Sequence, residues 1–354
     1  MRGMYIHIPF CLSKCAYCDF YSLKFTQSLA DEYTKAVIAR LDNINDTVDT
    51  VYFGGGTPSV IGYKRIEEML SHIDYAENSE ITVECNPKTA TAKFLQGIAA
   101  AGVNRISIGL QSAVDTELSA RTRTHTAADV KTACDNARAV GIDNITLDLM
   151  LGIPNQTADT VRKSIHFCES CGAKHISAYM LKIEPNTPFA AMPETAFPDD
   201  DYTALLYETA VSELESIGYK QYEISNFAKS NCESRHNLKY WNCEEYYGIG
   251  PAAHSFINGK RYYYERDIAK FIGGAKPIFD SDFGGFAEYA MLRLRLNDGL
   301  IYNDCAARGI AVPPDFEAKC EAYAKIGLLT VDDLGVRFTK KGFLVQNAVL
   351  CEIL

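Results

Sequence analysis

Short apolar runs alternate with amphipathic stretches through the first half of the chain. Six of these runs have the residue types and length of buried strands, at residues 5–8, 50–53, 81–85, 105–109, 144–149 and 175–179. The stretches between them place apolar residues at helical spacing, at residues 29–41, 66–73, 94–101, 127–140 and 161–168. Strands that alternate with helices predict right-handed crossovers and a parallel sheet, so the predicted fold class is α/β.

The alternation in residues 1–180 is compatible with two architectures. One is a partial (β/α)6 barrel, and the other is a doubly wound open sheet. Ligands bind outside the carboxyl ends of the strands in both of them. The candidate functional residues are therefore those that end or follow an apolar run.

The pattern changes after residue 180. Residues 181–285 contain proline-bounded loops and one predicted helix, at 202–217, and we expect them to form an accessory region. Residues 286–354 predict a mostly helical, winged-helix-like domain, with helices at 287–296 and 316–326 and a two-stranded wing within 328–339. This segment is not strongly basic, so packing over the barrel or a partner contact is expected rather than DNA binding.

Net charge and composition limit the classes of partner and the compartment that the sequence predicts. The 354 residues carry a formal net charge of -10, which argues against nucleic acid, because clustered Lys and Arg provide most phosphate binding. No apolar run reaches the length of a membrane span and no secretory signal is present, so any membrane contact would be peripheral. The 12 cysteines are scattered, unlike those of a secreted disulfide scaffold. The sequence therefore predicts a cytoplasmic protein.

Three of those cysteines lie close together near the amino terminus. Cys11, Cys15 and Cys18 form a C-x3-C-x2-C array, whose spacing suits an iron-sulfur cluster. An isolated trio predicts a cubane whose fourth iron binds a small chelating cofactor instead of the protein. The alternatives are a zinc site that borrows His7 or Asp19, or three unrelated core thiols. Zinc knuckles usually have a second cysteine pair downstream, and none follows this array, which favours the open cluster.

Residues 5–20, YIHIPFCLSKCAYCDF, resemble the cluster loop of radical S-adenosylmethionine (radical SAM) proteins. More narrowly, they resemble the oxygen-independent coproporphyrinogen III oxidase family and, within it, the haem chaperone branch. Similar motifs recur as far as residue 255, and the C-terminal remainder is also similar to that family's terminal domain. The resemblance implies a partial, TIM-like (β/α)6 barrel that holds a 4Fe-4S cluster and S-adenosylmethionine.

Several motifs at strand ends carry the same resemblance. The run Gly54-Gly55-Gly56-Thr57-Pro58 exposes backbone that can approach a ligand closely, although glycine also serves a tight turn. Glu84 ends a predicted strand, where a carboxylate can accept hydrogen bonds from ribose hydroxyls or simply face solvent. The resemblance implies that the contacts of one S-adenosylmethionine match Tyr5, Gly55 and Glu84. It implies that the contacts of a second match Tyr17, Gly56, Thr57, Gln111, Arg123 and Asp148. Whether a second molecule binds stays open, as does a structural Arg123–Asp148 bridge inside the barrel.

The stretch HNLKYW at residues 236–241 contains the one tryptophan of the chain. Haem needs an axial ligand such as histidine and a flat aromatic surround. The resemblance to the H-N-x-x-Y-W pattern of the haem chaperones makes His236 the candidate ligand, with His254 a lesser candidate. Without that resemblance, a histidine that caps a turn beside an aromatic cluster would be the expectation.

These motifs support three functions. The first is a haem chaperone that passes haem to acceptor apoproteins. The second is an oxygen-independent coproporphyrinogen III oxidase that acts through a 5'-deoxyadenosyl radical, and the third is an interaction protein with structural zinc. The oxidases carry a further cysteine where this chain has Phe20, and an extension before the tyrosine that Tyr5 matches, so the chaperone is favoured. The acceptor and a cluster-dependent homodimer are left open.

Overall fold

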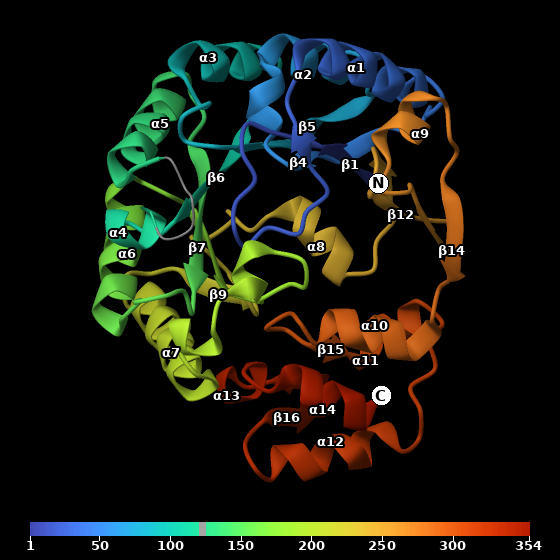
Figure 1. Ribbon diagram of the computed structural model, residues 1–354. Helices are drawn as coiled ribbons and strands as arrows, with labels where there is room; N and C mark the ends of the chain where they lie inside the picture. The colour runs from blue at the N-terminus through green and yellow to red at the C-terminus, as the bar shows by residue number, and fades with distance from the viewer. Residues whose placement is uncertain (120–124) are drawn as a thin grey trace.

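The computed structural model of the chain describes residues 1–119 and 125–354. A curved sheet forms its centre, and helices line the convex outer face (Figure 1). All six strands predicted for the barrel are present. They are β1 (Arg2–Ile8), β4 (Val48–Gly55), β5 (Tyr75–Cys85), β6 (Arg105–Gln111), β7 (Asn144–Leu151) and β8 (His175–Met180).

The order of these strands distinguishes the two predicted architectures. They are parallel neighbours in the order β1-β4-β5-β6-β7-β8, which is their order along the chain. A doubly wound sheet reverses direction at a switch point, whereas this sheet winds one way and curls. The partial (β/α)6 barrel is therefore confirmed. The helices of its outer layer are α1 (Gln27–Leu41), α2 (Tyr63–Leu70), α3 (Ala92–Ala100), α5 (Ala127–Ala139) and α6 (Ala158–Ser170).

Side-chain alternation along the strands separates a helix-facing core from a polar barrel interior. On β1, Met4, Ile6 and Ile8 are buried in the hydrophobic core, while Tyr5 faces inward. The same period places alternate residues of β6, β7 and β8 along an internal cavity, as at Arg105 and Ser107. The apolar face explains why the helices pack outside, and the polar face supplies the candidate site.

The sheet continues beyond the barrel on both edges. On one side β11 (Tyr246–Ile249) pairs in parallel with β1, and β12 (His254–Ile257), β13 (Lys260–Tyr263) and β14 (Ile278–Asp282) follow it in antiparallel order. On the other side β10 (Asn226–Ala228) and β9 (Lys220–Glu223) extend from β8. These strands come from the predicted accessory region, so they share the sheet of the barrel. The boundaries at residues 180 and 285 stay predictions.

The shorter elements connect or cap this sheet. The strands of the cluster loop are β2 (Phe10–Cys11) and β3 (Leu23–Lys24), and the helices are α4 (Asp115–Ser119), α7 (Asp200–Ser216), α8 (Arg235–Trp241) and α9 (Ile268–Ile272). Single 3-10 turns occupy Pro58–Ile61, Pro188–Ala191 and Glu194–Ala196. Helix α8 lies inside the curve of the sheet (Figure 1).

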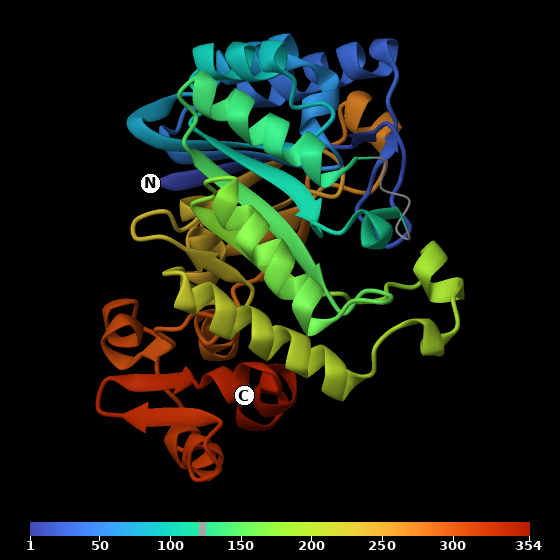
Figure 2. The ribbon, with the colours of Figure 1, turned by 90° about the vertical axis from the view of Figure 1, so that its left-hand side faces the viewer.

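The C-terminal segment forms a separate lobe below the barrel (Figure 2). Its helices are α10 (Gly285–Arg293), α11 (Tyr302–Ala307), α12 (Phe316–Ala324), α13 (Lys340–Phe343) and α14 (Gln346–Ile353), and its strands are β15 (Leu300–Ile301), β16 (Leu329–Asp332) and β17 (Gly335–Phe338). The strand order β15-β17-β16 adds a third strand to the predicted two-stranded wing. A second hydrophobic cluster, with Phe316 and Phe338, forms its core.

Across residues 1–119 and 125–354, every helix is too short or too polar to span a lipid bilayer.

Candidate functional site

The three predicted cluster cysteines converge at the carboxyl ends of the barrel strands. Cys11 ends β2, and the turn that follows brings Cys15 and Cys18 back, with the Cys18 N–H donating to the Cys15 carbonyl at 3.2 Å. All three are partly exposed and line a cavity of about 170 Å³, which we call the cysteine cavity. The Cys11 Sγ lies 3.5 Å from the Thr57 Oγ1, so the loop contacts the glycine-rich segment after β4.

The two side chains considered as zinc ligands are already bonded elsewhere. The ring of His7 lies between the Tyr5 hydroxyl (3.0 Å to Nδ1) and the Tyr21 carbonyl (2.9 Å to Nε2). Asp19 pairs with Arg266 at 3.4 Å. Among the described residues, no three His, Cys, Asp or Glu side chains are close enough to share one metal ion. A cubane does not require that, because each cysteine binds a different iron, and the partly exposed trio beside a cavity fits such a cluster.

Gly55, which ends β4, and Gly56, which follows it, are required by their surroundings. A Cβ on Gly56 would lie 2.7 Å from the Phe10 carbonyl and 2.8 Å from the Ile8 carbonyl, so no side chain fits there. Gly55 has a φ of +107° and donates its N–H to the Glu84 Oε2 at 3.1 Å. The two glycines therefore let the backbone at the ends of β1 and β4 approach closely. They also line the cavity with bare backbone.

Glu84 is held at the floor of this cavity. Its Oε1 accepts a hydrogen bond from the Tyr52 hydroxyl at 2.8 Å, and its Oε2 accepts the Gly55 N–H. Burial raises the pKa of the Glu84 carboxyl to about 7, against the opposing effect of the Tyr52 hydrogen bond. An ammonium or ribose hydroxyl placed in the cavity would stabilise the ionised carboxylate. The residue is therefore suited to hold a polar, cationic cofactor.

Three further predicted contacts, Tyr17, Gln111 and Asp148, line the same cavity. Gln111 has a positive φ of 71° and accepts a hydrogen bond from the Tyr179 hydroxyl at 2.8 Å. The Asp148 carboxylate accepts from the Ser107 hydroxyl at 3.2 Å, and Tyr17 projects from the cluster loop. A non-glycine residue in the left-handed region is strained, and such strain concentrates at functional sites. Arg123 lies outside the described residues, so its predicted roles are untested.

Tyr5, another predicted contact, lies beside Glu84: its ring and the Glu84 Oε1 are 3.0 Å and 3.1 Å from the position that a Cβ on Gly54 would take. It projects from β1 into the barrel interior, where its hydroxyl bonds His7, and it does not line the cysteine cavity.

A second cavity, of about 540 Å³, occupies the barrel interior and shares Glu84, Asp148 and Tyr179 with the first. Its wall includes Arg105, which is 2% exposed and donates to the Thr146 hydroxyl at 2.6 Å. Arg105 is not among the residues predicted from the sequence, nor are the roles of Tyr52 and Tyr179. The period-two spacing of polar residues on β6, β7 and β8 was the available signal.

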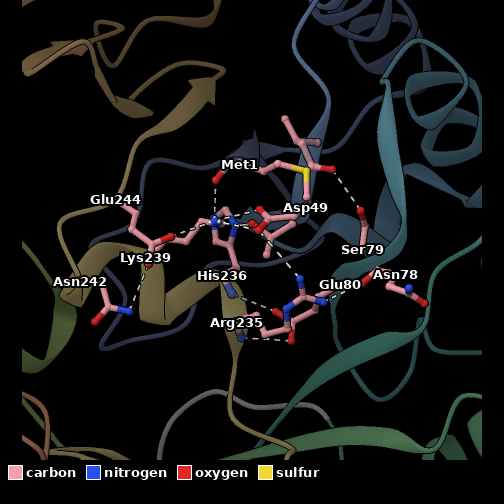
Figure 3. A network of polar contacts seen from close by, with 12 residues as sticks. Met1, Asp49, Asn78, Ser79, Glu80, Arg235, His236, Lys239, Asn242 and Glu244 are labelled. Carbon is pink, nitrogen blue, oxygen red and sulfur yellow. Dashed lines mark hydrogen bonds and ion pairs between the residues drawn. The ribbon is translucent and has the colours of Figure 1, made fainter.

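His236 lies near the opposite, amino-terminal end of the barrel from the cysteines. Helix α8 is fixed there because Glu80 accepts hydrogen bonds from the backbone N–H groups of Arg235 (3.1 Å) and His236 (3.0 Å). The buried Lys239 ammonium pairs with Asp49 at 2.8 Å and with Glu244 at 3.1 Å (Figure 3). The imidazole of His236 is fully buried and does not reach either cavity described above.

A third cavity, of about 450 Å³, opens where α8 meets β11–β13 and α10, and we call it the aromatic cleft. Its aromatic walls come from Tyr5, Tyr240, Trp241, Tyr246 and Phe256, and His254 also lines it. The predicted H-N-x-x-Y-W stretch therefore contributes its two aromatic residues to a cavity, while its histidine lies behind them.

Comparison with known proteins gives consistent matches along the chain. Residues 5–168 match the radical SAM superfamily, and residues 287–345 match the HemN C-terminal domain. A Mycobacterium tuberculosis protein named heme chaperone HemW is 33% identical, over 99% of this chain and 94% of its own length. Proteins of the same name from Bacillus subtilis (38% identical; 74% of this chain, 72% of the relative) and Escherichia coli (37%; 72% and 70%) are also similar.

Among solved structures, the coproporphyrinogen III oxidase HemN from Escherichia coli, described as a radical SAM enzyme, is similar with a TM-score of 0.86. The alignment covers 99% of this chain and 89% of that one, at 20% sequence identity. At that identity the likeness establishes the fold alone.

Proposed function

Because the chain belongs to the family of the proteins named heme chaperone HemW, within the radical SAM superfamily, we propose that it binds haem and delivers it to acceptor apoproteins. The observation that carries this proposal is the aromatic cleft. Tyr240 and Trp241 of the H-N-x-x-Y-W stretch line it, and its volume of about 450 Å³ lies in the usual range of ligand pockets. A flat macrocycle needs such aromatic walls.

The proposal includes a 4Fe-4S cluster on Cys11, Cys15 and Cys18. Such a cluster would leave one iron free for S-adenosylmethionine, and it supplies one-electron chemistry when bound. The bare backbone of Gly55 and the Glu84 carboxylate would hold the first cofactor molecule, and Tyr5, the third residue matched to it, lies beside Glu84 without lining the cavity.

The residues matched to a second S-adenosylmethionine support a site beside the first. Tyr17, Thr57, Gln111 and Asp148 line the cysteine cavity together with Gly56. Arg123, the last of that set, keeps its proposed role on the resemblance alone.

His236 belongs to the proposed haem site through its position in the same stretch. The ring of His236 does not line the cleft. It contacts a residue that does, because its Nε2 lies 2.7 Å from the hydroxyl of Tyr240. Direct ligation by His236 would require this hydrogen bond to break. Replacing His236 with alanine is expected to weaken haem binding by either route, since the variant also releases Tyr240 from its position in the cleft wall.

One observation favours the second function, an oxygen-independent coproporphyrinogen III oxidase. The barrel cavity of about 540 Å³ shares Glu84 and Asp148 with the cysteine cavity, so a substrate there would lie beside the cluster. Against it, Phe20, a residue that is 66% exposed, stands where the oxidases have a further cysteine. We rank the oxidase below the chaperone.

The test is haem titration of the full chain after anaerobic reconstitution with iron and sulfide, followed by absorption spectroscopy. We expect saturable binding that weakens in His236→Ala and is unchanged in His72→Ala, a control histidine whose ion pair with Asp42 lies outside the cleft. Haem should then transfer to an apoprotein such as apomyoglobin. Decarboxylation of coproporphyrinogen III with S-adenosylmethionine and reductant, without haem binding, would replace the chaperone with the oxidase.

We also propose that the chain works in the cytoplasm and that cluster binding promotes a homodimer, since the cysteine loop lies at the surface with Leu12 61% exposed. Light scattering before and after reconstitution measures the mass. An unchanged monomer would contradict the homodimer.

A further inference from the structure

The imidazole of His236 has no free ring nitrogen with which to bind iron. Its Nδ1 lies 2.8 Å from the Thr50 Oγ1, and its Nε2 lies 2.7 Å from the Tyr240 hydroxyl. The ring is stacked on Tyr52 at 5.3 Å and on Tyr5 at 6.4 Å, and the side chain is 0% exposed. Both hydrogen bonds and both stacking contacts fix the ring behind the cleft wall.

A second histidine lies in the cleft itself. His254 begins β12, lines the aromatic cleft, and is exposed. Its ring stacks on Tyr263 at 5.7 Å with an interplanar angle of 28°, which leaves the edge that carries the nitrogens uncovered by that contact. Among the described residues, neither ring nitrogen of His254 has a hydrogen-bond partner within the distance limits for a bond.

The rest of the cleft has the chemistry of a porphyrin pocket. Trp241, Tyr246 and Phe256 offer aromatic surface for the macrocycle. Arg261 lies on the same wall, paired with Glu288 and stacked on Phe256 at 4.6 Å. A guanidinium at the edge of the cavity is suited to a propionate carboxylate. Aromatic surface, the Arg261 guanidinium and an accessible imidazole match the three parts of haem, namely ring, carboxylates and iron, while Glu244 and Glu288 add two carboxylates to the lining.

Other donors in the cleft are less suited to iron. Burial raises the pKa of the Cys243 thiol to about 11, so the thiolate that binds metals is scarce at neutral pH. Met291 offers a thioether on α10 and is 45% exposed, which makes it a second candidate donor that the experiment must separate from His254.

We infer that His254 is the axial iron ligand for haem in the aromatic cleft, and that His236 is a positioning residue that holds Tyr240 in the wall. The inference rests on the proposed haem binding and deepens it. His236 stays neutral and buried, its hydrogen bond fixes the Tyr240 ring, and the haem face meets the imidazole of His254 from the open side.

The experiment compares the ferric haem complexes of the full-length wild type and three variants by absorption and electron paramagnetic resonance spectroscopy. His254→Ala is expected to lose the imidazole-ligated spectrum, and added imidazole should restore it. His236→Gln, which keeps a donor and an acceptor for Thr50 and Tyr240, should retain an imidazole-ligated spectrum. Met291→Leu conserves volume and removes the thioether, so it should retain the nitrogen ligand.

The outcomes separate the inference from the function on which it rests. If His254→Ala keeps the wild-type spectrum while His236→Gln loses it, His236 is the ligand and the inference is wrong, although haem binding stands. If the wild type does not bind haem, the proposed function fails and the inference with it. Far-UV circular dichroism confirms that each variant is folded. His254 is exposed, so its replacement is not expected to unfold the protein.

Discussion

Glu84 gives the ligand-free barrel a carboxyl group whose charged form is unfavourable. Burial raises its pKa from 4.5 to about 7. Between these two values the folded protein binds more protons at this site than the unfolded chain does. The contribution of Glu84 to the free energy of unfolding is therefore fully present below pH 4.5 and is lost as the pH rises through 7. We predict that Glu84→Gln stabilises the ligand-free protein, and that the gain grows with pH.

The size of the effect follows from the two pKa values. The difference between 4.5 and about 7 corresponds to roughly 3 kcal/mol when the acid is fully ionised. The gain of the neutral glutamine should be about 1 kcal/mol at pH 5 and approach about 3 kcal/mol at pH 8. These are upper values, since Glu84 lines a cavity and is only half-buried. Glutamine keeps an oxygen for the Gly55 N–H and an amide that can donate to the Tyr52 hydroxyl.

Urea unfolding of ligand-free wild type and Glu84→Gln, followed by circular dichroism at pH 5 and pH 8, measures the gain. Glu68→Gln is the matched control, because it makes the same change on the exposed face of α2. The control should behave as the wild type does at both pH values. A gain for Glu84→Gln that is equal at pH 5 and pH 8, or a loss at pH 8, would refute the reasoning that the buried carboxyl titrates near neutrality.

Three further predictions concern the cluster loop, α8 and the glycine run at the end of β4. After reconstitution, Cys11→Ser should lose most bound iron and its visible absorption, whereas Cys351→Ser on the exposed face of α14 should retain both; equal iron contents would contradict the cluster assignment. Burial lowers the pKa of His236 to about 3 from 6.5, so stability should fall by about 2 kcal/mol between pH 7 and pH 5 in urea titrations. His236→Gln should lack this contribution, and an unchanged slope would argue against a neutral buried ring. Gly56→Ala should lower both the melting temperature and cluster incorporation more than Gly273→Ala, because Gly273 has a φ of -68° that suits alanine and its added Cβ would approach no atom closer than 3.1 Å; equal losses would show that crowding at Gly56 is not decisive.

The barrel could be predicted from the sequence because each of its strands has one face that must be apolar. On β1 the core positions Met4, Ile6 and Ile8 follow the two-residue period and lie under the helices. Strand β14 lacks this signal, because most of its residues are exposed and Phe279 is 51% exposed. Strand β15 has two residues, Leu300 and Ile301, too few to show any period. The edges of the sheet and the third wing strand therefore appear only in the structure.

The cysteine cavity could also be predicted, since parallel strands bring their carboxyl ends together whatever their separation in the chain. Gln111 ends β6, Glu84 is the last but one residue of β5, and Asp148 lies three residues before the end of β7; the structure places all three in one cavity. The environment of His236 could not be predicted in this way. Its partner Thr50 is 186 residues away, and the pair forms because α8 packs against the amino-terminal half of β4.

This packing also explains how the cysteine cavity and the aromatic cleft are connected. The Tyr52 hydroxyl donates to Glu84 in the first cavity, and the Tyr52 ring stacks on His236 at 5.3 Å. His236 bonds the Tyr240 hydroxyl, and Tyr240 lines the cleft. Two hydrogen bonds and one ring contact thus join the candidate cofactor residue to the wall of the proposed haem site. If the proposed haem binding holds, a histidine fixed in the middle of this chain would act on haem through the position of Tyr240, so the motif could require a histidine without exposing it to iron.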